Sequence, residues 1–374
     1  MTRIDLAISQ ETAQHVDKST VRGAKPIPIF AKLTVLIARR GAFLAGLFSN
    51  LSSRASRAGA RRLLIDGMAK QVKRNKSPAE ASIRIGISGW RYEPWRGTFY
   101  PKGLAQRLEL NYAASKLGSI EINGSFYSLQ RPESYAQWYR ETPADFVFTV
   151  KGPRFLTHML RLRNVQQPLA NFLASGIFNL REKLGPILWQ FPPNFKFDVD
   201  RMAQFFDMLP HDTAAAAKLA RKRHARMHGR SKLSVDITRP MRHAVEIRHE
   251  SFKNPKFIEL LRRHNIALVV AETARRWPML WDITADFVYM RLHGDKELYR
   301  SGYSDQALNR WARRIEAWHS GSEPKDAVRV TKASPKSKRP RDVFCYFDNT
   351  DVKLRAPFDA QSIMRKLSLR PSTL

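Results

Sequence analysis

The stretch Phe287-Val-Tyr-Met-Arg-Leu-His293 is an apolar run that ends in charged and polar residues, and seven similar runs occur elsewhere in the chain. Segments with helical features separate almost every successive pair of runs, and this alternation indicates parallel strands joined by right-handed crossovers. Eight strands within roughly 250–300 residues match the TIM barrel. We therefore predict an α/β fold, a (β/α)8 TIM-type barrel in residues 81–370. The predicted strands are Ile83–Ser88, Ser119–Asn123, Phe146–Lys151, Pro186–Gln190, His243–Arg248, Ile266–Glu272, Phe287–His293 and Val343–Asn349.

Several predicted helices begin at residues that commonly cap helices. Asp198 and Ser304 each precede apolar residues at helical spacing, and the pair Asn254-Pro255 places a capping residue before a first-turn proline. The sixth strand–helix unit is the weakest, because residues 274–286 contain Trp and Pro and fit only a short helix.

The composition indicates a folded, strongly basic protein. The chain has 374 residues, 43% of them hydrophobic, and a formal net charge of +32. Such a charge favours polyanions such as nucleic acid, or an anionic membrane surface. However, residues 1–80 carry a net charge of +10, residues 211–242 carry +7 and residues 320–342 carry +4. Most of the excess therefore lies in appendages of the predicted barrel, through which nucleic acid is a possible partner.

The basic N-terminal extension, residues 1–80, differs from the rest of the chain. Ile27–Leu51 is apolar, but three cations interrupt it, so no run approaches the ~20 residues of a membrane-spanning helix. Leucines on one face followed by arginines predict a basic amphipathic helix that contacts a membrane surface or a partner through residues 27–62. The alternative is a disordered extension, or upstream sequence with the functional start at Met68. We expect no signal peptide here.

Two basic insertions interrupt the barrel pattern. Asp212–Gly229 is rich in Ala and basic residues and predicts a helix before the fifth strand, at the bottom of the barrel and outside the pocket. This helix is either a solvated surface or a nucleic-acid contact. Residues 320–342 are rich in Ser, Pro, Lys and Arg and predict a long flexible loop.

The chain has one cysteine, Cys345, so neither an internal disulfide nor a thiolate metal cluster is possible. This composition is compatible with a cytoplasmic protein. Histidines and carboxylates do occur at the predicted strand ends, but no His-x-His or His-x-x-x-His spacing is found among them. Neighbouring cations also disfavour a divalent ion, and we predict neither a metal nor another cofactor.

Charged and polar residues gather at the carboxyl ends of the predicted strands, where TIM barrels have their active sites. Alternate residues of a strand share a face, and the charged face must be the barrel mouth because the outer face packs on helices. The predicted catalytic residues are Glu121, Lys151 and Glu246. The predicted substrate-binding residues are Trp90, Tyr92, Asn123, Tyr127, Arg154, His158, Gln190, Arg248, His249, Arg291, His293, Asp348 and Asn349.

The predicted cations and carboxylates of the mouth are equal in number. They are Lys151, Arg154, Arg248 and Arg291 on one side and Glu121, Glu246, Glu272 and Asp348 on the other. An unpaired buried charge costs several kcal/mol, so these groups must pair with one another or with a ligand. The first alternative is a structural salt-bridge network, and the second is a ligand site.

The sequence also resembles a known family. Ile85-Gly-Ile-Ser-Gly-Trp-Arg-Tyr-Glu-Pro-Trp-Arg-Gly-Thr-Phe-Tyr-Pro101 is similar to the opening signature of the YecE-like proteins, a domain-of-unknown-function family. The similarity continues through Glu121-Ile-Asn-Gly-Ser-Phe-Tyr127, Val150-Lys-Gly-Pro-Arg-Phe-Leu-Thr-His158 and four later motifs up to Tyr346-Phe-Asp-Asn349. The resemblance covers about residues 83–367 and implies a TIM-type fold, but it implies no activity.

Three functional hypotheses follow. The first is an enzyme acting on a phosphate- or carboxylate-bearing small molecule, with Arg248, Arg291 and Lys151 holding the anion. Glu121 or Glu246 would be the general base, and Lys151 could serve as acid, base or nucleophile. Pocket walls would come from the aromatic residues Trp90, Tyr92 and Tyr127.

The second hypothesis is a barrel that binds or processes nucleic acid, based on the net charge and on aromatic residues near the mouth that could stack on bases. The third is a non-catalytic scaffold tethered by its N-terminal segment. The sequence does not predict the oligomeric state.

Overall fold

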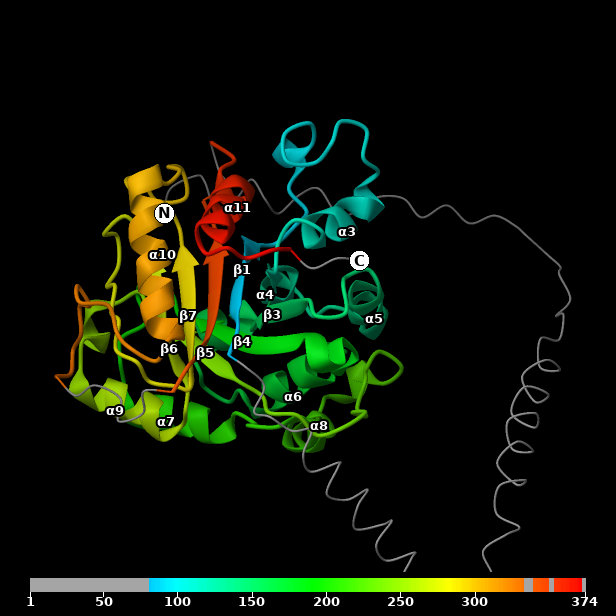
Figure 1. Cartoon of the computed structure of the whole chain (residues 1–374). Helices are drawn as coiled ribbons and strands as arrows, with labels where there is room; N and C mark the ends of the chain where they lie inside the picture. Colours follow the sequence, from blue (N-terminus) through cyan, green and yellow to red (C-terminus); the bar gives the residue numbers. More distant parts are fainter. Residues whose placement is uncertain (1–80, 333–338, 350–352, 372–374) are drawn as a thin grey trace, which may run out of the picture. The chain divides into compact units, whose positions relative to one another are not determined.

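The computed structural model describes residues 81–332, 339–349 and 353–371, and these form a closed barrel of eight strands in sequence order (Figure 1). Every neighbouring pair is parallel, including β1 with β8, where Ile83 pairs with Val343 and Ile87 with Phe347. The TIM-type fold predicted from the sequence is confirmed. The strands are β1 (Ile83–Ser88), β2 (Ser119–Ile122), β3 (Val147–Lys151), β4 (Leu184–Gln190), β5 (His243–Glu246), β6 (Ala267–Glu272), β7 (Phe287–Leu292) and β8 (Asp342–Phe347).

Helices surround the barrel, and the predicted capping residues begin three of them. The side chains of Asp198, Asn254 and Ser304 accept hydrogen bonds from backbone amides in the first turns of α7, α9 and α10. The α-helices are α3 (Glu109–Ala114), α4 (Gly124–Tyr127), α5 (Pro132–Arg140), α6 (Gln166–Ala174), α7 (Val199–Met208), α8 (Thr213–Ala220), α9 (Pro255–Arg263), α10 (Asp305–His319) and α11 (Ala356–Lys366). A π-helical turn spans Phe155–Met159, and short 3-10 helices span Glu93–Trp95, Gln106–Leu108, Ile177–Lys183, Ala225–Met227 and Glu250–Phe252.

Two cores follow from the alternation of residues along the strands. Outward-facing apolar residues pack against the helices, as α10 and α11 pack against β8 (Figure 1). The barrel interior holds a smaller cluster that includes Leu188, Phe344 and Tyr346. Tyrosine hydroxyls inside the barrel are satisfied, since the Tyr346 hydroxyl lies 2.7 Å from Ser119 Oγ and the Tyr289 hydroxyl 3.0 Å from Thr149 Oγ1. The interior is therefore filled below the mouth.

The sixth unit has no helix between β6 and β7 within the described residues 273–286. Its place is taken by Trp281, which is buried against two tryptophans of α10, Trp311 and Trp318. The carboxylate of the next residue, Asp282, accepts hydrogen bonds from the amides of Val330 and Thr331. Part of the 320–342 insertion is thus anchored to this connection.

The first insertion differs from its prediction in two ways. The helix α8 ends at Ala220 instead of continuing to Gly229. The following segment runs beside α6, where the amide of His224 donates to Asn171 Oδ1, and it brings Arg226 to a cavity that Tyr127 also lines. The connection therefore does not stay at the bottom of the barrel.

The predictions for residues 1–80, including the amphipathic helix of 27–62, lie outside the described residues. Among the residues that are described, no helix has the length and apolar character needed to span a membrane.

Candidate active site

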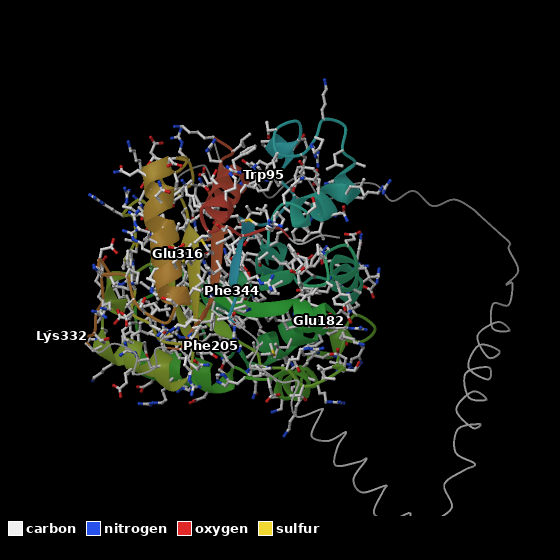
Figure 2. The ribbon with its side chains drawn as sticks, viewed as in Figure 1. Trp95, Glu182, Phe205, Glu316, Lys332 and Phe344 are labelled. Carbon is white, nitrogen blue, oxygen red and sulfur yellow. The ribbon has the colours of Figure 1, made fainter. Side chains whose placement is uncertain are left out.

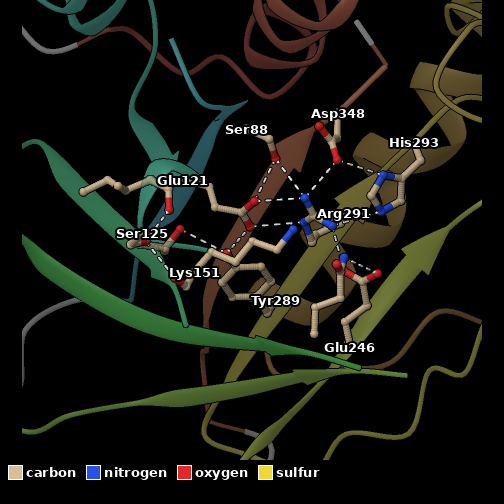
Figure 3. A network of polar contacts seen from close by, with 12 residues as sticks. Ser88, Glu121, Ser125, Lys151, Glu246, Tyr289, Arg291, His293 and Asp348 are labelled. Atoms are coloured by element: carbon tan, nitrogen blue, oxygen red, sulfur yellow. Dashed lines mark hydrogen bonds and ion pairs between the residues drawn. The ribbon is translucent and has the colours of Figure 1, made fainter. Parts of the chain in front are cut away.

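The guanidinium of Arg291 on β7 lies at the centre of a network of charged side chains in the barrel mouth (Figure 3). Its Nε and Nη2 donate to the two carboxylate oxygens of Glu121 on β2, at 3.1 and 2.9 Å. Its Nη1 donates to Glu246 on β5 at 2.7 Å, and Nη2 also donates to Asp348 after β8 at 2.9 Å. One fully buried cation therefore joins three carboxylates from three other strand ends.

Further donors complete the shell of Glu121. Its Oε1 accepts a hydrogen bond of 2.9 Å from Ser88 at the end of β1, and its Oε2 accepts one of 2.6 Å from the Tyr289 hydroxyl. With the two bonds from Arg291, both carboxylate oxygens have two donors each. Glu121 is fully buried and is held in one orientation.

Glu246 extends the network toward β4 and the loop after β7. Its Oε1 accepts from Gln190 Nε2 and from Arg248 Nε, both at 2.9 Å. The Arg248 guanidinium lies 3.9 Å above the ring of Trp277 and donates to the Tyr299 hydroxyl. Burial alone would raise the pKa of Glu246, but the two neighbouring guanidinium groups outweigh it and hold the pKa well below its ordinary value.

Asp348 connects the network to His293. Its Oδ2 is shared between Arg291 Nη2 at 2.9 Å and His293 Nδ1 at 3.1 Å. Burial opposes ionisation of Asp348, but the Arg291 charge prevails and lowers its pKa. Burial and the same guanidinium lower the pKa of His293, which favours a neutral imidazole at neutral pH.

Lys151, at the end of β3, differs from the other buried charges of the mouth. It is 7% exposed, and no carboxylate oxygen among the described residues lies within ion-pair distance of its Nζ. The ammonium lies 4.2 Å from the centre of the Phe126 ring. Burial and the positive charge of Arg291 lower its pKa from 10.5 to about 8, although the carboxylates of the network act in the opposite direction.

The rim above Lys151 consists of residues from the two loops that follow β2 and β3. His158 packs edge-on against Phe126, and its pKa is lowered to about 4 by burial and by the Lys151 charge, so its ring is neutral at neutral pH. Arg154 is exposed and makes no ion pair with a described residue, and its guanidinium lies 6.0 Å from the centre of the Tyr127 ring. Tyr127 itself is 65% exposed.

Other predicted residues line a cleft of about 460 Å³ that adjoins the mouth. Trp90, Tyr92 and Asn123 all lie along this cleft, and Ser88 separates it from the carboxylate of Glu121. The chain turns into this cleft at Gly89, where φ is +78° and a side chain would be strained.

Three predicted residues lie away from the network. Glu272 occupies the opposite face of β6, because its neighbour Ala271 is the residue level with Arg291. His249 accepts a hydrogen bond from the amide of Ser251 and begins a short helix. Asn349 follows Asp348 and so faces outward, where it donates to Asp359. Glu272 is therefore not the fourth carboxylate of the mouth.

The prediction from sequence missed three contributors to the site. Tyr289 lies two residues before Arg291 on the same strand face, so the period of two that was applied to charged residues would have identified it. Trp277 and Tyr299 come from the loops after β6 and β7. Their positions depend on loop conformation, for which the sequence carried no signal.

The ion pairs of the mouth decide which of its charged groups remain available to a ligand. The three carboxylates of Glu121, Glu246 and Asp348 are occupied by arginine donors, and Arg291 has no donor nitrogen left without a partner. All three nitrogens of the Arg291 guanidinium are therefore hydrogen-bonded to side chains of the chain itself. Lys151 and Arg154 remain available to bind an anion, and the amine of Lys151 is the group that can exchange a proton near neutral pH.

The comparisons agree with this architecture. The model of the family described as "Protein of unknown function DUF72" matches residues 84–374. The chain is 22% identical over 244 residues to the UPF0759 protein YecE of Escherichia coli O157:H7, which is 65% of this chain and 84% of that protein. It is 29% identical over 126 residues to the UPF0759 protein YunF of Bacillus subtilis, of which it spans 44%.

Two solved structures have the same fold. A DUF72 family protein of Thermotoga maritima matches with a TM-score of 0.58 and 25% identity, over 77% of this chain and 99% of that one. A DUF72 family protein of Enterococcus faecalis matches with a TM-score of 0.56 and 16% identity, over 77% and 96% of the two chains.

Proposed function

The chain belongs to the DUF72 family of proteins of unknown function, and we propose that it is an enzyme that acts on an anionic substrate at the barrel mouth by acid–base chemistry. The observation that carries the proposal is the buried ammonium of Lys151, which has no ion-pair partner among the described residues although three carboxylates lie in the same mouth. A protein gains no stability from such a charge, because burial without a partner is costly.

In this proposal, Lys151 and Arg154 bind the anionic group of the substrate. The pKa of about 8 leaves about one Lys151 in ten as a free amine at pH 7, so the residue can give or accept a proton during the reaction. Glu121 and Glu246 act indirectly. They hold Arg291 in place, and the charge of Arg291 together with burial keeps the Lys151 pKa low.

Reductive alkylation tests the proposal, with glyoxylate as the probe because it carries both a carboxylate and an aldehyde. The free amine adds to the aldehyde and loses water to form an imine, which added cyanoborohydride reduces to a stable secondary amine. We expect mass spectrometry of the full chain at pH 7 to find Lys151 modified faster than the exposed lysine Lys256, and inorganic phosphate to slow the modification of Lys151 alone.

Equal rates at the two lysines would contradict the lowered pKa. Modification of Lys151 that phosphate does not slow would contradict the anion site. The variant Arg154→Gln removes one proposed anion contact at an exposed position, so it should weaken the protection by phosphate and should also slow the alkylation by glyoxylate, whose carboxylate uses the same contact.

A second candidate function, binding of single-stranded nucleic acid, has its own supporting observation. Arg131, Arg226 and Arg230 line a cavity of about 200 Å³, and none of them makes an ion pair with a described residue. An adjoining cavity of about 310 Å³ is lined by Tyr127 and Phe155, whose partly exposed rings could stack on bases. The test is oligonucleotide binding that weakens steeply with salt and with Arg226→Gln. Binding that this variant leaves unchanged contradicts the candidate.

A further inference from the structure

The segment at the end of β3 carries three groups of the mouth. Lys151 ends the strand, Arg154 precedes the π-helical turn Phe155–Met159, and His158 lies within that turn. π-Helical turns are rare and often occur at functional sites. The barrel interior below the mouth is filled by the apolar cluster that contains Phe344 (Figure 2). A ligand therefore reaches Lys151 from the rim, where His158 lies.

The ring of His158 has one nitrogen held by the chain and one that is open to solvent. Its Nδ1 lies 2.9 Å from Oγ1 of the buried Thr157. A hydroxyl can donate or accept, so Thr157 is a partner for both the neutral and the protonated imidazole. Nε2 has no hydrogen-bond partner among the described residues, and it is not one of the unpartnered atoms that the fold buries. His158 can therefore change its protonation state and donate from Nε2 to a ligand.

Two cations of the mouth also have nitrogens open to solvent. Lys151 Nζ and Arg248 Nη1 make no hydrogen bond to a described residue, and neither is among the buried unpartnered atoms. The Lys151 ammonium and the His158 ring contact the same side chain, because Nζ lies 4.2 Å and the imidazole centre 5.1 Å from the centre of the Phe126 ring. These donors therefore belong to one part of the mouth.

The positive charges of the mouth keep His158 neutral. Burial and the charges of Lys151, Arg248 and Arg154 lower its pKa to about 4, and only partial compensation comes from the carboxylate of Glu246. An anion that binds among the three cations offsets their effect on the imidazole. Binding of an anion and protonation of His158 should consequently favour each other.

The balance of charges indicates which anion fits best. Four cations face three carboxylates among the described residues of the mouth: Lys151, Arg154, Arg248 and Arg291 against Glu121, Glu246 and Asp348. A monoanion neutralises the one excess positive charge. A phosphate group brings three acceptor oxygens and nearly two negative charges, and a proton on His158 neutralises the second charge.

We infer that the anionic group bound in the mouth is a dianion, such as the phosphate of a phosphomonoester, and that His158 takes up a proton from solvent as this group binds and donates to it from Nε2. This inference rests on the proposed anion site and adds the substrate class. It also gives the site a second group that exchanges a proton, beside the amine of Lys151.

Sulfate and methanesulfonate test the inference, because neither changes its protonation between pH 5 and pH 7 and only sulfate is a dianion. Their affinities for the full chain are measured by calorimetry at both pH values. If binding raises the pKa of His158 from about 4 to about 6, sulfate binds about tenfold more tightly at pH 5 than at pH 7. Lys151, with a pKa of about 8, is already about nine-tenths protonated at pH 7 and adds little. Methanesulfonate should bind with nearly the same affinity at both pH values.

Three variants and one spectroscopic measurement identify the groups. His158→Gln should abolish the rise in sulfate affinity, whereas His211→Gln, at an exposed position after α7, should keep it. Lys151→Met should weaken sulfate at both pH values. In the wild type, NMR titration of the histidine rings should show one pKa that moves from about 4 to about 6 when sulfate is saturating.

The outcomes separate this inference from the anion site. Sulfate that binds in a Lys151-dependent way with equal affinity at pH 5 and pH 7 shows that the inference is wrong and that the anion site stands. A rise that persists in His158→Gln assigns the proton to another group, and an equal rise for methanesulfonate contradicts the dianion; either result overturns the inference. If neither anion binds at either pH, both the anion site and the inference are wrong.

Discussion

Replacing Lys151 by methionine should stabilise the protein while removing its proposed catalytic group. Methionine keeps an unbranched apolar chain beside Phe126 and eliminates a buried ammonium that has no ion-pair partner among the described residues. The fold lowers the Lys151 pKa from 10.5 to about 8, a difference of about 2.5 pH units. At 1.36 kcal/mol per unit, protonated Lys151 destabilises the fold by about 3 kcal/mol at pH 7.

The sign of the pH dependence follows from proton binding. Between pH 8 and pH 10.5 the unfolded chain keeps the Lys151 proton and the folded chain has released it. The wild-type protein therefore gains stability relative to Lys151→Met as the pH rises through this interval. The advantage of the variant should be about 3 kcal/mol at pH 7, or roughly 5–10 °C in Tm, and should nearly vanish above pH 10.5.

The assay is denaturant unfolding of the two full-length proteins at pH 7, 9 and 10.5, with free energies compared at each pH. The difference between the unfolding free energies of the wild type and the variant cancels the contribution of every titrating group that the two proteins share. The exposed lysine variant Lys256→Met is the matched control, and its stability difference should not change with pH. A Lys151→Met difference that is constant from pH 7 to 10.5 would refute the assignment of a lowered pKa to this lysine.

Three other predictions concern the network and the helices. Arg291→Met leaves three buried carboxylates without their common cation and should lower the unfolding free energy by about 3–5 kcal/mol. The exposed control Arg313→Met should change it by almost nothing, and equal denaturant midpoints for the two variants would contradict the network. Asp348 has a lowered pKa, so its ionised form stabilises the fold above pH 3.8 and this contribution is lost as the pH falls through the lower folded-state pKa. Wild-type stability should consequently fall more steeply than that of Asp348→Asn when unfolding is measured from pH 4 to pH 2, and parallel curves would argue against the shift. Ser304→Ala removes the side-chain cap of α10 and should cost about 1 kcal/mol in the unfolding free energy, whereas an unchanged free energy would show that the cap contributes nothing.

The fold was predictable because the apolar runs of strands and the capping residues of helices are local features of the sequence. The apolar runs identified each strand, and the caps at Asp198, Asn254 and Ser304 marked helix starts correctly. The region between β6 and β7 was harder, because Trp281 fills the space of a helix by packing on α10, and such a tertiary contact has no local sequence signal.

The candidate site was predictable where a strand face determined it. Glu121, Glu246 and Arg291 share the inward face of their strands, and they meet as the period of two requires. The same rule was not applied to Glu272, which lies one position out of phase with Arg291 and faces away. Which charges pair and which remain unpaired was not predictable, because that depends on distances across the barrel. Arg291, which was predicted to bind substrate, forms ion pairs with three carboxylates of the chain, whereas Lys151 has no such partner among the described residues.

The pairing of β1 with β8 has a consequence for synthesis of the protein. The first strand finds its second neighbour only after about 250 further residues have been translated, which takes roughly 10–50 s at ordinary elongation rates. During that time the nascent chain presents an unpaired strand edge that can join another chain. Closing the ring also fixes Asp342, which accepts hydrogen bonds from Ser82 and from Arg242 near the start of β5. Pairing of β8 with β1 therefore ends the exposure of the unpaired edge of β1.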